Sequence, residues 1–266
     1  MKITTLIENR VSKRNLVAEH GLSFAIEHVG KLFLFDTGQT RNFALNAEQM
    51  GIGIDKVDYL VISHGHDDHT GGLSYFLESN EKAKIILKKE ALWPKFKHSN
   101  YIGIDRLINT GHKRFQFVNK VTEIIPTVFI VPNIERHYEI DRHMNGFSTQ
   151  NDGAVLDDQF EDELFLVLKQ KNSISLLSSC SHNGITNMIE TAKHNFPSPV
   201  ENVIGGFHIK DAPMEVVDHI TAYFNRSAIQ NVYTGHCTGT EKFAKIQTRC
   251  NAKVSYNETG DVVEVN

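Results

Sequence analysis

The sequence predicts a mixed α/β chain that has two β-sheets with helices outside them. Short apolar runs rich in β-branched residues recur along the whole chain, and amphipathic segments lie between them. Each half begins with strands joined by tight connections and then alternates strand with helix. This order is neither a plain Rossmann order nor a pure sandwich, whereas two sheets with external helices accommodate it.

The individual elements follow from the hydrophobic periodicity, taken in chain order. In the first half, apolar runs predict strands within 2–8, 22–28, 31–38, 56–65 and 83–89, and amphipathic segments predict helices at about 40–50 and 70–79. In the second half, strands are expected within 127–133, 163–170, 173–180, 201–208, 230–237 and 252–258, and helices at about 183–195, 213–225 and 239–250.

The segment 132–160 has a different character. Polar and turn-forming residues dominate it, and apolar periodicity fades. We expect a long surface loop near the active site, because loops of this length in a compact domain are often lids or binding loops.

Composition and charge narrow the class of protein. With 266 residues and 40% hydrophobic content, the chain can bury a sizeable core, and we expect a single domain over 1–266. The formal charge of −4 shows no excess of basic residues of the kind that binds nucleic-acid phosphates. The chain contains no apolar run of about 18 residues, so no membrane span is expected. In the first residues of the chain, a charged residue comes too early for a signal-peptide core. We therefore expect a cytoplasmic protein without nucleic-acid or membrane partners, and a homo-oligomer remains open.

The three cysteines do not indicate a disulfide framework. They are few, widely spaced and odd in number, and no CxxC pair occurs. We expect reduced thiols at Cys180, Cys237 and Cys250.

The most informative stretch is "SHGHDDHTGG", residues 63–72, which holds three histidines and two aspartates within six consecutive positions. The run "DYLVISHG" predicts a buried strand that ends at Ser63, and "TGGLSYFLES" predicts a helix, so the cluster lies in a strand-to-helix loop. Neutral imidazoles and a carboxylate are suitable ligands for Zn²⁺, Mn²⁺ or Fe²⁺.

The same spacing predicts two ions rather than one. His64 and His66 point the same way if the chain is locally extended, whereas Asp68 and His69 lie farther along the turn and can face a second ion. A solvated histidine-rich loop or a helix cap is the simpler alternative. We keep that alternative for Asp67 alone.

These residues resemble those of a known family. "HGHDDH" is similar to the H-x-H-x-D-H signature of the metallo-β-lactamase superfamily, and "KLFLFDTG" resembles the strand ending in D-T-G that precedes it. "SSCSHNGI", "VIGGFH" and "VYTGHCTG" look like later motifs of the dihydropterin ribofuranosyl-aminobenzene phosphate synthase-like branch. The resemblance covers residues 1–258 and implies a four-layer αβ/βα sandwich of two mixed sheets flanked by helices, with a dinuclear metal site at the edge where the strands end.

The resemblance also implies metal ligands. His64 and His66 would bind the first ion, and Asp68, His69 and His236 the second. Zn²⁺ is the first choice for both ions, and Mn²⁺ or Fe²⁺ are alternatives.

The third ligand of the first ion is less direct, because the T-x-G-H-T-x-G motif of many hydrolytic members is missing. His112 in "NTGHKR" imitates part of it, but no strand-turn-strand context supports this residue. His182 follows an apolar strand directly and opens a helix, so we favour it. Cys180 lies where many members place a bridging aspartate, and it either binds metal as a thiolate, supports the site from behind or is a buried small hydrophobe.

Two further residues receive supporting roles. Asp36 ends a strand and resembles the aspartate that orients a ligand histidine, although an Asx turn would also explain it. His208 follows two glycines at a strand end and is expected to touch substrate, donate a proton or pack.

The expected activity is metal-dependent hydrolysis of an ester- or phosphate-containing small molecule. Two divalent ions activate water and polarise the bond to be cleaved, while Asp68 holds the attacking water and His208 assists the leaving group. One alternative is the transferase reaction implied by the branch, in which an aromatic amine replaces water and a pterin is joined to an aminobenzene ribofuranosyl phosphate. The other is a metal-binding sensor without turnover.

Overall fold

The computed structural model describes residues 1–142 and 144–266, and the chain divides into two compact units. The first unit comprises Met1–Asn119, Asn145–Asp162 and Glu258–Asn266, and the second comprises Lys120–Met144 and Glu163–Asn257. Each unit has its own seven-stranded sheet and its own hydrophobic core. The single domain over 1–266 stays a prediction.

The sheet of the first unit is mixed. Its order is β18-β1-β2-β3-β4-β5-β8. The pairs from β18 to β3 are antiparallel, with a tight hairpin turn joining β2 to β3, and crossovers make the pairs from β3 to β8 parallel. The strands are β1 (Lys2–Ile7), β2 (Ser23–His28), β3 (Lys31–Phe35), β4 (Tyr59–Val61), β5 (Lys84–Leu87), β8 (Phe115–Phe117) and β18 (Val262–Glu264).

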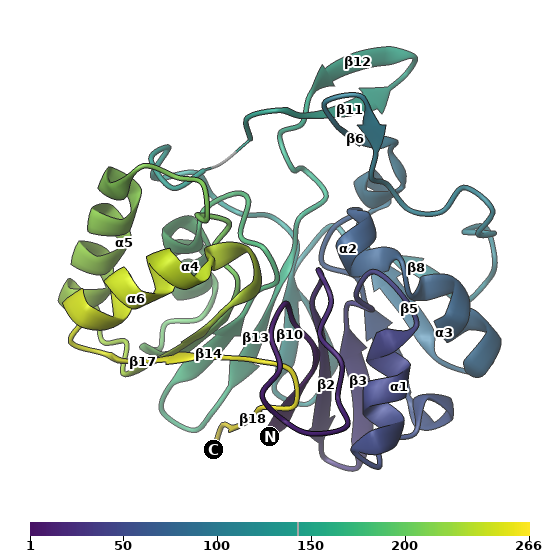
Figure 1. Ribbon diagram of the computed structural model, residues 1–266, viewed down its shortest axis with the longest axis horizontal. Coiled ribbons are helices and arrows are strands. Elements are labelled where there is room, and N and C mark those ends of the chain that lie inside the picture. The colour runs from purple at the N-terminus through teal and green to yellow at the C-terminus, as the bar shows by residue number, and fades with distance from the viewer. Residues whose placement is uncertain (143) are drawn as a thin grey trace. The chain divides into compact units, whose positions relative to one another are not determined.

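Two helices cover one face of this sheet (Figure 1). In α1 (Asn42–Gln49), Phe43 and Ala47 are four residues apart and face the core, and in α3 (Leu73–Ser79) the buried pair is Leu73 and Phe76. The short helix α2 (Asp67–Thr70) and the 3₁₀ helices η1 (Ile54–Lys56) and η2 (Lys89–Leu92) complete the connections. The expected helices at 40–50 and 70–79 are confirmed.

The second unit repeats this plan. Its sheet has the order β17-β16-β15-β14-β13-β10-β9, with parallel pairs from β17 to β14 and antiparallel pairs from β14 to β9. The strands are β9 (Thr122–Ile125), β10 (Val128–Val131), β13 (Phe165–Lys169), β14 (Ile174–Leu177), β15 (Val200–Gly205), β16 (Asn231–Thr234) and β17 (Lys253–Tyr256).

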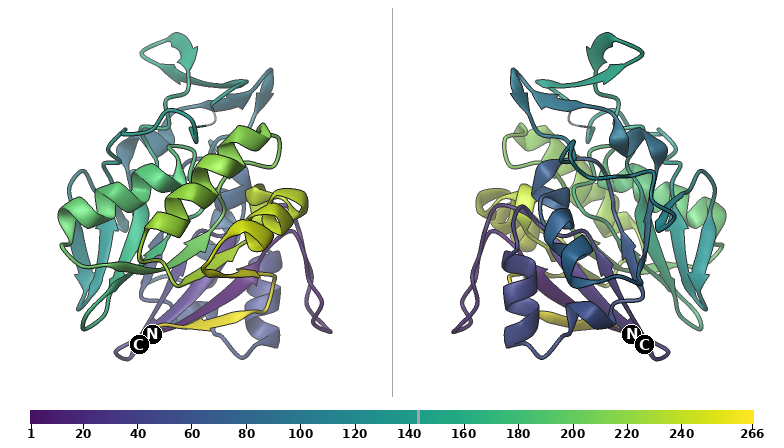
Figure 2. Two further views of the ribbon diagram at one scale, coloured as in Figure 1. Left: turned by 90° about the vertical axis from the view of Figure 1, so that its left-hand side faces the viewer. Right: turned by 90° about the vertical axis from the view of Figure 1, so that its right-hand side faces the viewer.

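Three helices pack on this second sheet, and the left view of Figure 2 shows them together. In α4 (Ile185–Asn195) the buried residues Ile185, Met188, Ile189 and Ala192 recur at helical spacing, which is why this segment is a helix. The other helices are α5 (Met214–Arg226) and α6 (Thr240–Arg249), preceded by the 3₁₀ helix η3 (His236–Thr238). All expected strands and helices of the second half are confirmed. No helix within 1–142 or 144–266 is both long and apolar enough to cross a membrane.

A small antiparallel sheet corrects the expectation for residues 132–160. It belongs to the first unit and has the order β12-β11-β6-β7 (Figure 1). Its strands are β6 (Lys95–Lys97), β7 (Asn100–Tyr101), β11 (Phe147–Asn151) and β12 (Ala154–Asp157). A loop over the whole of 132–160 is therefore wrong. All four residues of β12 are exposed, so they carry no apolar alternation that a sequence could reveal. Position 143, within the same range, lies outside the described residues.

Candidate metal centre

The sequence motif lies in the first unit, in the segment between β4 and α3. The ring of His64 lies 4.7 Å from that of His66 and 4.4 Å from that of His69, measured between centroids. All three imidazoles are buried. The structure thus brings the three predicted histidines of this unit together at the end of a parallel strand, where ligand sites of α/β sheets are usually found.

Asp36 supports this segment from the end of the neighbouring strand β3. One carboxylate oxygen accepts a hydrogen bond from the Ser63 N–H at 2.7 Å, and the other accepts from the Ser63 hydroxyl at 2.7 Å and from His69 Nδ1 at 2.9 Å. The backbone of Asp36 has a φ of 63°, an uncommon value for a residue other than glycine. A strained and fully buried carboxylate at this place indicates a site and not an ordinary turn.

These hydrogen bonds determine the tautomers of two histidines. The hydroxyl hydrogen of Ser63 goes to Asp36, so its oxygen accepts from His64 Nδ1 at 2.8 Å. His69 Nδ1 donates to the Asp36 carboxylate. The lone pair of each neutral ring is then on Nε2, as in histidine ligands whose other nitrogen is held by a carboxylate or a hydroxyl.

Asp68 is next to the imidazole of His69. Its Oδ2 lies 3.4 Å from His69 Nε2 and also 3.4 Å from Nε2 of His20. Sequence reasoning missed His20, whose side chain is 62% exposed and which belongs to no recognisable motif. The cluster around Asp68 therefore contains one more imidazole than the motif predicts.

The histidines of the first unit differ in the direction in which their pKa is shifted. Burial lowers the pKa of His64 and His66 well below the usual value, so both rings are neutral at pH 7, which is the form that binds metal. Burial acts in the same direction on His69, but the charge of Asp68 and the hydrogen bond to Asp36 outweigh it and raise the pKa of His69 well above its usual value. A cation bound at His69 Nε2 would replace a proton.

The second unit also contains a group of possible donors. One donor atom each of Cys180, His182 and His208 lies within 4.8 Å of the other two, and the same holds for Cys180, His236 and Cys237. The rings of His182 and His208 are 3.9 Å apart between centroids. Histidines and thiols in this arrangement are suitable for a borderline or soft cation such as Zn²⁺.

Glu163 holds the loop that carries His182. Its carboxylate accepts hydrogen bonds from the backbone N–H groups of His182 at 2.6 Å and Asn183 at 2.8 Å, and all three residues are buried. Ser181, one residue earlier, has a φ of 59°. Sequence reasoning missed Glu163, because an acidic residue at a strand start is usually solvated.

Cys237 contacts the backbone of His208 in the second unit. The N–H of His208 donates to Cys237 Sγ at 3.2 Å, and a Cβ on Gly206 would lie only 2.6 Å from that sulfur, so this position excludes any side chain. Burial raises the pKa of the Cys237 thiol, but the hydrogen bond with Cys180 and the charges of His236 and His208 leave it well below its usual value. His208 and His236 have φ values of 51° and 50°. Their backbones are thus held in a costly conformation.

The predicted ligands fall into these two groups, one in each unit. His64, His66, Asp68 and His69 converge in the first unit, and His182 and His236 belong to the group around Cys180 in the second. Which ion each would bind stays a prediction. His112 is exposed, and its Nδ1 accepts a hydrogen bond from the Arg114 N–H at 3.3 Å, in line with a loop residue.

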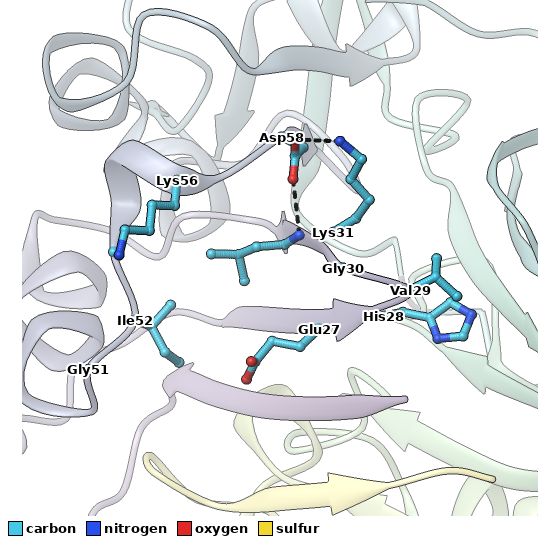
Figure 3. Close-up of a pocket in the computed structure, with 11 residues that line it drawn as sticks. Glu27, His28, Val29, Gly30, Lys31, Gly51, Ile52, Lys56 and Asp58 are labelled. Atoms are coloured by element: carbon cyan, nitrogen blue, oxygen red, sulfur yellow. Dashed lines mark hydrogen bonds and ion pairs between the residues drawn. The ribbon is translucent and has the colours of Figure 1, made fainter.

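A surface pocket of 560 Å³ lies elsewhere in the first unit (Figure 3). It is lined by the turn between β2 and β3 and by residues 51–58, whereas the histidine segment follows the other end of β4. Asp58 accepts hydrogen bonds there from Lys31 Nζ at 3.0 Å and from the Leu32 N–H at 3.2 Å. These bonds join the first residues of β3 to the residue before β4.

This chain is similar to several known proteins. The family profile of the metallo-beta-lactamase superfamily matches residues 17–153. An uncharacterized protein of Methanocaldococcus jannaschii, MJ0448, is 30% identical over 99% of this chain and 100% of its own length. The 7,8-dihydropterin-6-methyl-4-(β-D-ribofuranosyl)-aminobenzene-5′-phosphate synthase of the same organism is 28% identical over 90% of this chain and 88% of its own. The crystal structure of Tm1679, described as a metal-dependent hydrolase of the β-lactamase superfamily, superposes with a TM-score of 0.89 at 30% identity and covers 100% of this chain and 99% of that one.

Proposed function

Because the chain belongs to the metallo-β-lactamase superfamily and has its fold, we propose that it is a metal-dependent hydrolase of an ester- or phosphate-containing small molecule. One observation carries the proposal, namely the buried hydrogen bonds that join His64 through Ser63 to Asp36 and Asp36 to His69. They hold two imidazoles in the tautomer that presents Nε2 to a cation.

The donor set fits divalent transition metals. The first unit offers three imidazoles and a carboxylate, and the second offers His182 and His236, all of them donors of the nitrogen and oxygen type that such ions prefer. We propose two ions, with Zn²⁺ as the first choice. When bound, such ions supply an activated water and a Lewis acid.

The protein's own groups then have distinct tasks. Asp68, 13% exposed, is accessible enough to accept a hydrogen bond from an attacking water. Asp36 and Ser63 hold His64 and His69 in place, and all four side chains are buried away from bulk water. We propose that His208 assists the leaving group; its backbone is held by the hydrogen bond to Cys237.

The test combines metal analysis with activity. Protein purified without added metal should contain about two transition-metal ions per chain and should slowly cleave generic phosphodiesters, lactones or thioesters. His66→Ala and Asp68→Ala should lower metal content and abolish turnover together, whereas His112→Ala, a loop histidine, should change neither. Full metal occupancy in the first two variants would overturn the assignment.

The 28% identity with the named synthase favours a second candidate function. In that reaction an aryl amine takes the place of water, so the same donors would serve a transferase. A metal-replete protein that hydrolyses nothing on the panel, yet joins a pterin pyrophosphate to an aryl amine, would make this the function.

A further inference from the structure

We propose that Asp162, paired with Lys95, is a positioning residue that holds the loop between His64 and His66 and increases its affinity for metal. The inference rests on the proposed metal binding by these histidines. It concerns the first unit alone, and no sequence motif includes either Asp162 or Lys95.

Gly65 is the point at which Asp162 contacts the loop. Its N–H donates to Asp162 Oδ2 at 2.7 Å, and Asp162 is fully buried. On another side of Gly65, a Cβ would lie 2.4 Å from the carbonyl oxygen of Ala91, so only glycine fits. Gly65, which lies between the two histidines, is therefore held between the Asp162 carboxylate and the backbone of Ala91.

Lys95 balances the buried charge. Its Nζ lies 2.8 Å from Asp162 Oδ1 and 2.8 Å from Asp158 Oδ2, and its side chain is only 1% exposed. Burial alone would raise the pKa of Asp162, but the Lys95 ammonium outweighs it and holds this pKa below its ordinary value. Asp162 is thus a carboxylate at neutral pH, and it places negative charge beside a loop that is proposed to bind cations.

Two carboxylates consequently hold the backbone on both sides of His64. Asp36 accepts from the Ser63 N–H and Asp162 accepts from the Gly65 N–H, each at 2.7 Å. The His66 ring is held as well, because Phe147 stacks on it with centroids 5.2 Å apart. A loop fixed in this way loses little conformational entropy when it binds an ion.

The decisive comparison is Asp162→Asn against Asp158→Asn in the full-length chain. Each variant removes one carboxylate from Lys95, but only Asp162 contacts the loop. We expect Asp162→Asn to weaken Zn²⁺ binding about tenfold, measured by chelator competition, and Asp158→Asn to leave it close to wild type, although both lower thermal stability. The visible spectrum of the Co²⁺-substituted protein should change in Asp162→Asn alone.

A second measurement avoids variants that fold poorly. In metal-free wild-type protein, hydrogen exchange of the backbone in 62–70 should already be slow, because the loop is held without an ion. Fast exchange there, wild-type Zn²⁺ affinity in Asp162→Asn, or an equal loss in Asp158→Asn would each overturn the inference. A protein that binds Zn²⁺ tightly but hydrolyses nothing would refute the hydrolase and leave this inference standing.

Discussion

The Nδ1 atom of His69 lies 2.9 Å from Oδ2 of Asp36, and both side chains are buried. The same carboxylate holds the backbone and the hydroxyl of Ser63, one residue before His64. A single carboxylate therefore sets the positions of two proposed metal-binding histidines that are five residues apart in the sequence.

Replacing Asp36 should weaken metal binding more than it disturbs the fold. In Asp36→Asn the side-chain NH₂ group must face at least one hydrogen-bond donor, so Ser63 and His69 are no longer both held in place. Zn²⁺ affinity should therefore fall about 10- to 100-fold, which is the usual loss when a residue that supports a metal ligand is replaced. Chelator competition measures this. Asp58→Asn, at the other end of β4, is the matched control and should bind Zn²⁺ like wild type. Equal affinity in both variants would contradict the role of Asp36.

The second unit allows the contribution of His182 to be separated from that of Cys180. If His182 binds metal and Cys180 does not, His182→Ala should lower metal content, whereas Cys180→Ser should leave it nearly unchanged. The exposed His194 offers a control, since its removal changes no buried donor. Elemental analysis of the three variants decides the matter. The opposite pattern would transfer the role to the thiolate, whose softness favours zinc over manganese.

The chain before position 143 is fastened to α4 and is not a free lid. The side chain of Asn187 accepts hydrogen bonds from the N–H groups of His137 and Tyr138, at 2.8 Å each, and donates to the Tyr138 carbonyl at 2.7 Å. Asn187→Ala leaves these backbone groups without their partner and should cost roughly 2 to 4 kcal/mol of unfolding free energy. It should also speed proteolytic cleavage within 133–142. Unchanged cleavage and melting temperature would show that this segment is held by other contacts.

The sequence predicts those elements that bury an apolar face. All expected strands and helices occur because each buries apolar residues, which form continuous runs in strands such as β13 and β14 and recur at helical spacing in α4. The strands of the small sheet are short and largely exposed, and β12 has no buried residue, so hydrophobic periodicity contains no signal for them. The pairing of β11 with β6, about 50 residues earlier, is a tertiary effect.

The candidate site shows the same limit. His64, His66, Asp68 and His69 were found because they share one short motif. Asp162 is 97 residues away from Gly65, and Lys95 and Asp158 are also distant, so only the folded chain reveals that these charges are buried and paired. In a sequence, a buried charge looks like a solvated one.

Cys250, at the end of α6, should be an unreactive thiol. Burial raises its pKa to about 11. At pH 8 only about one thiol in a thousand would then be ionised, against roughly a quarter for a free cysteine. Alkylation of native protein by iodoacetamide at pH 8 should therefore be roughly 250-fold slower at Cys250 than in denatured protein, and it should accelerate about tenfold per pH unit until the pH nears the thiol pKa. The folded state binds this proton more tightly than the unfolded state, so the linked stability is present below the unfolded pKa and is lost as the pH rises toward 11.

Mass spectrometry of the Cys250 peptide measures the alkylation rate, with Cys250→Ser to identify the product. Native labelling at pH 8 as fast as in denatured protein would show that the thiol is accessible and ordinary.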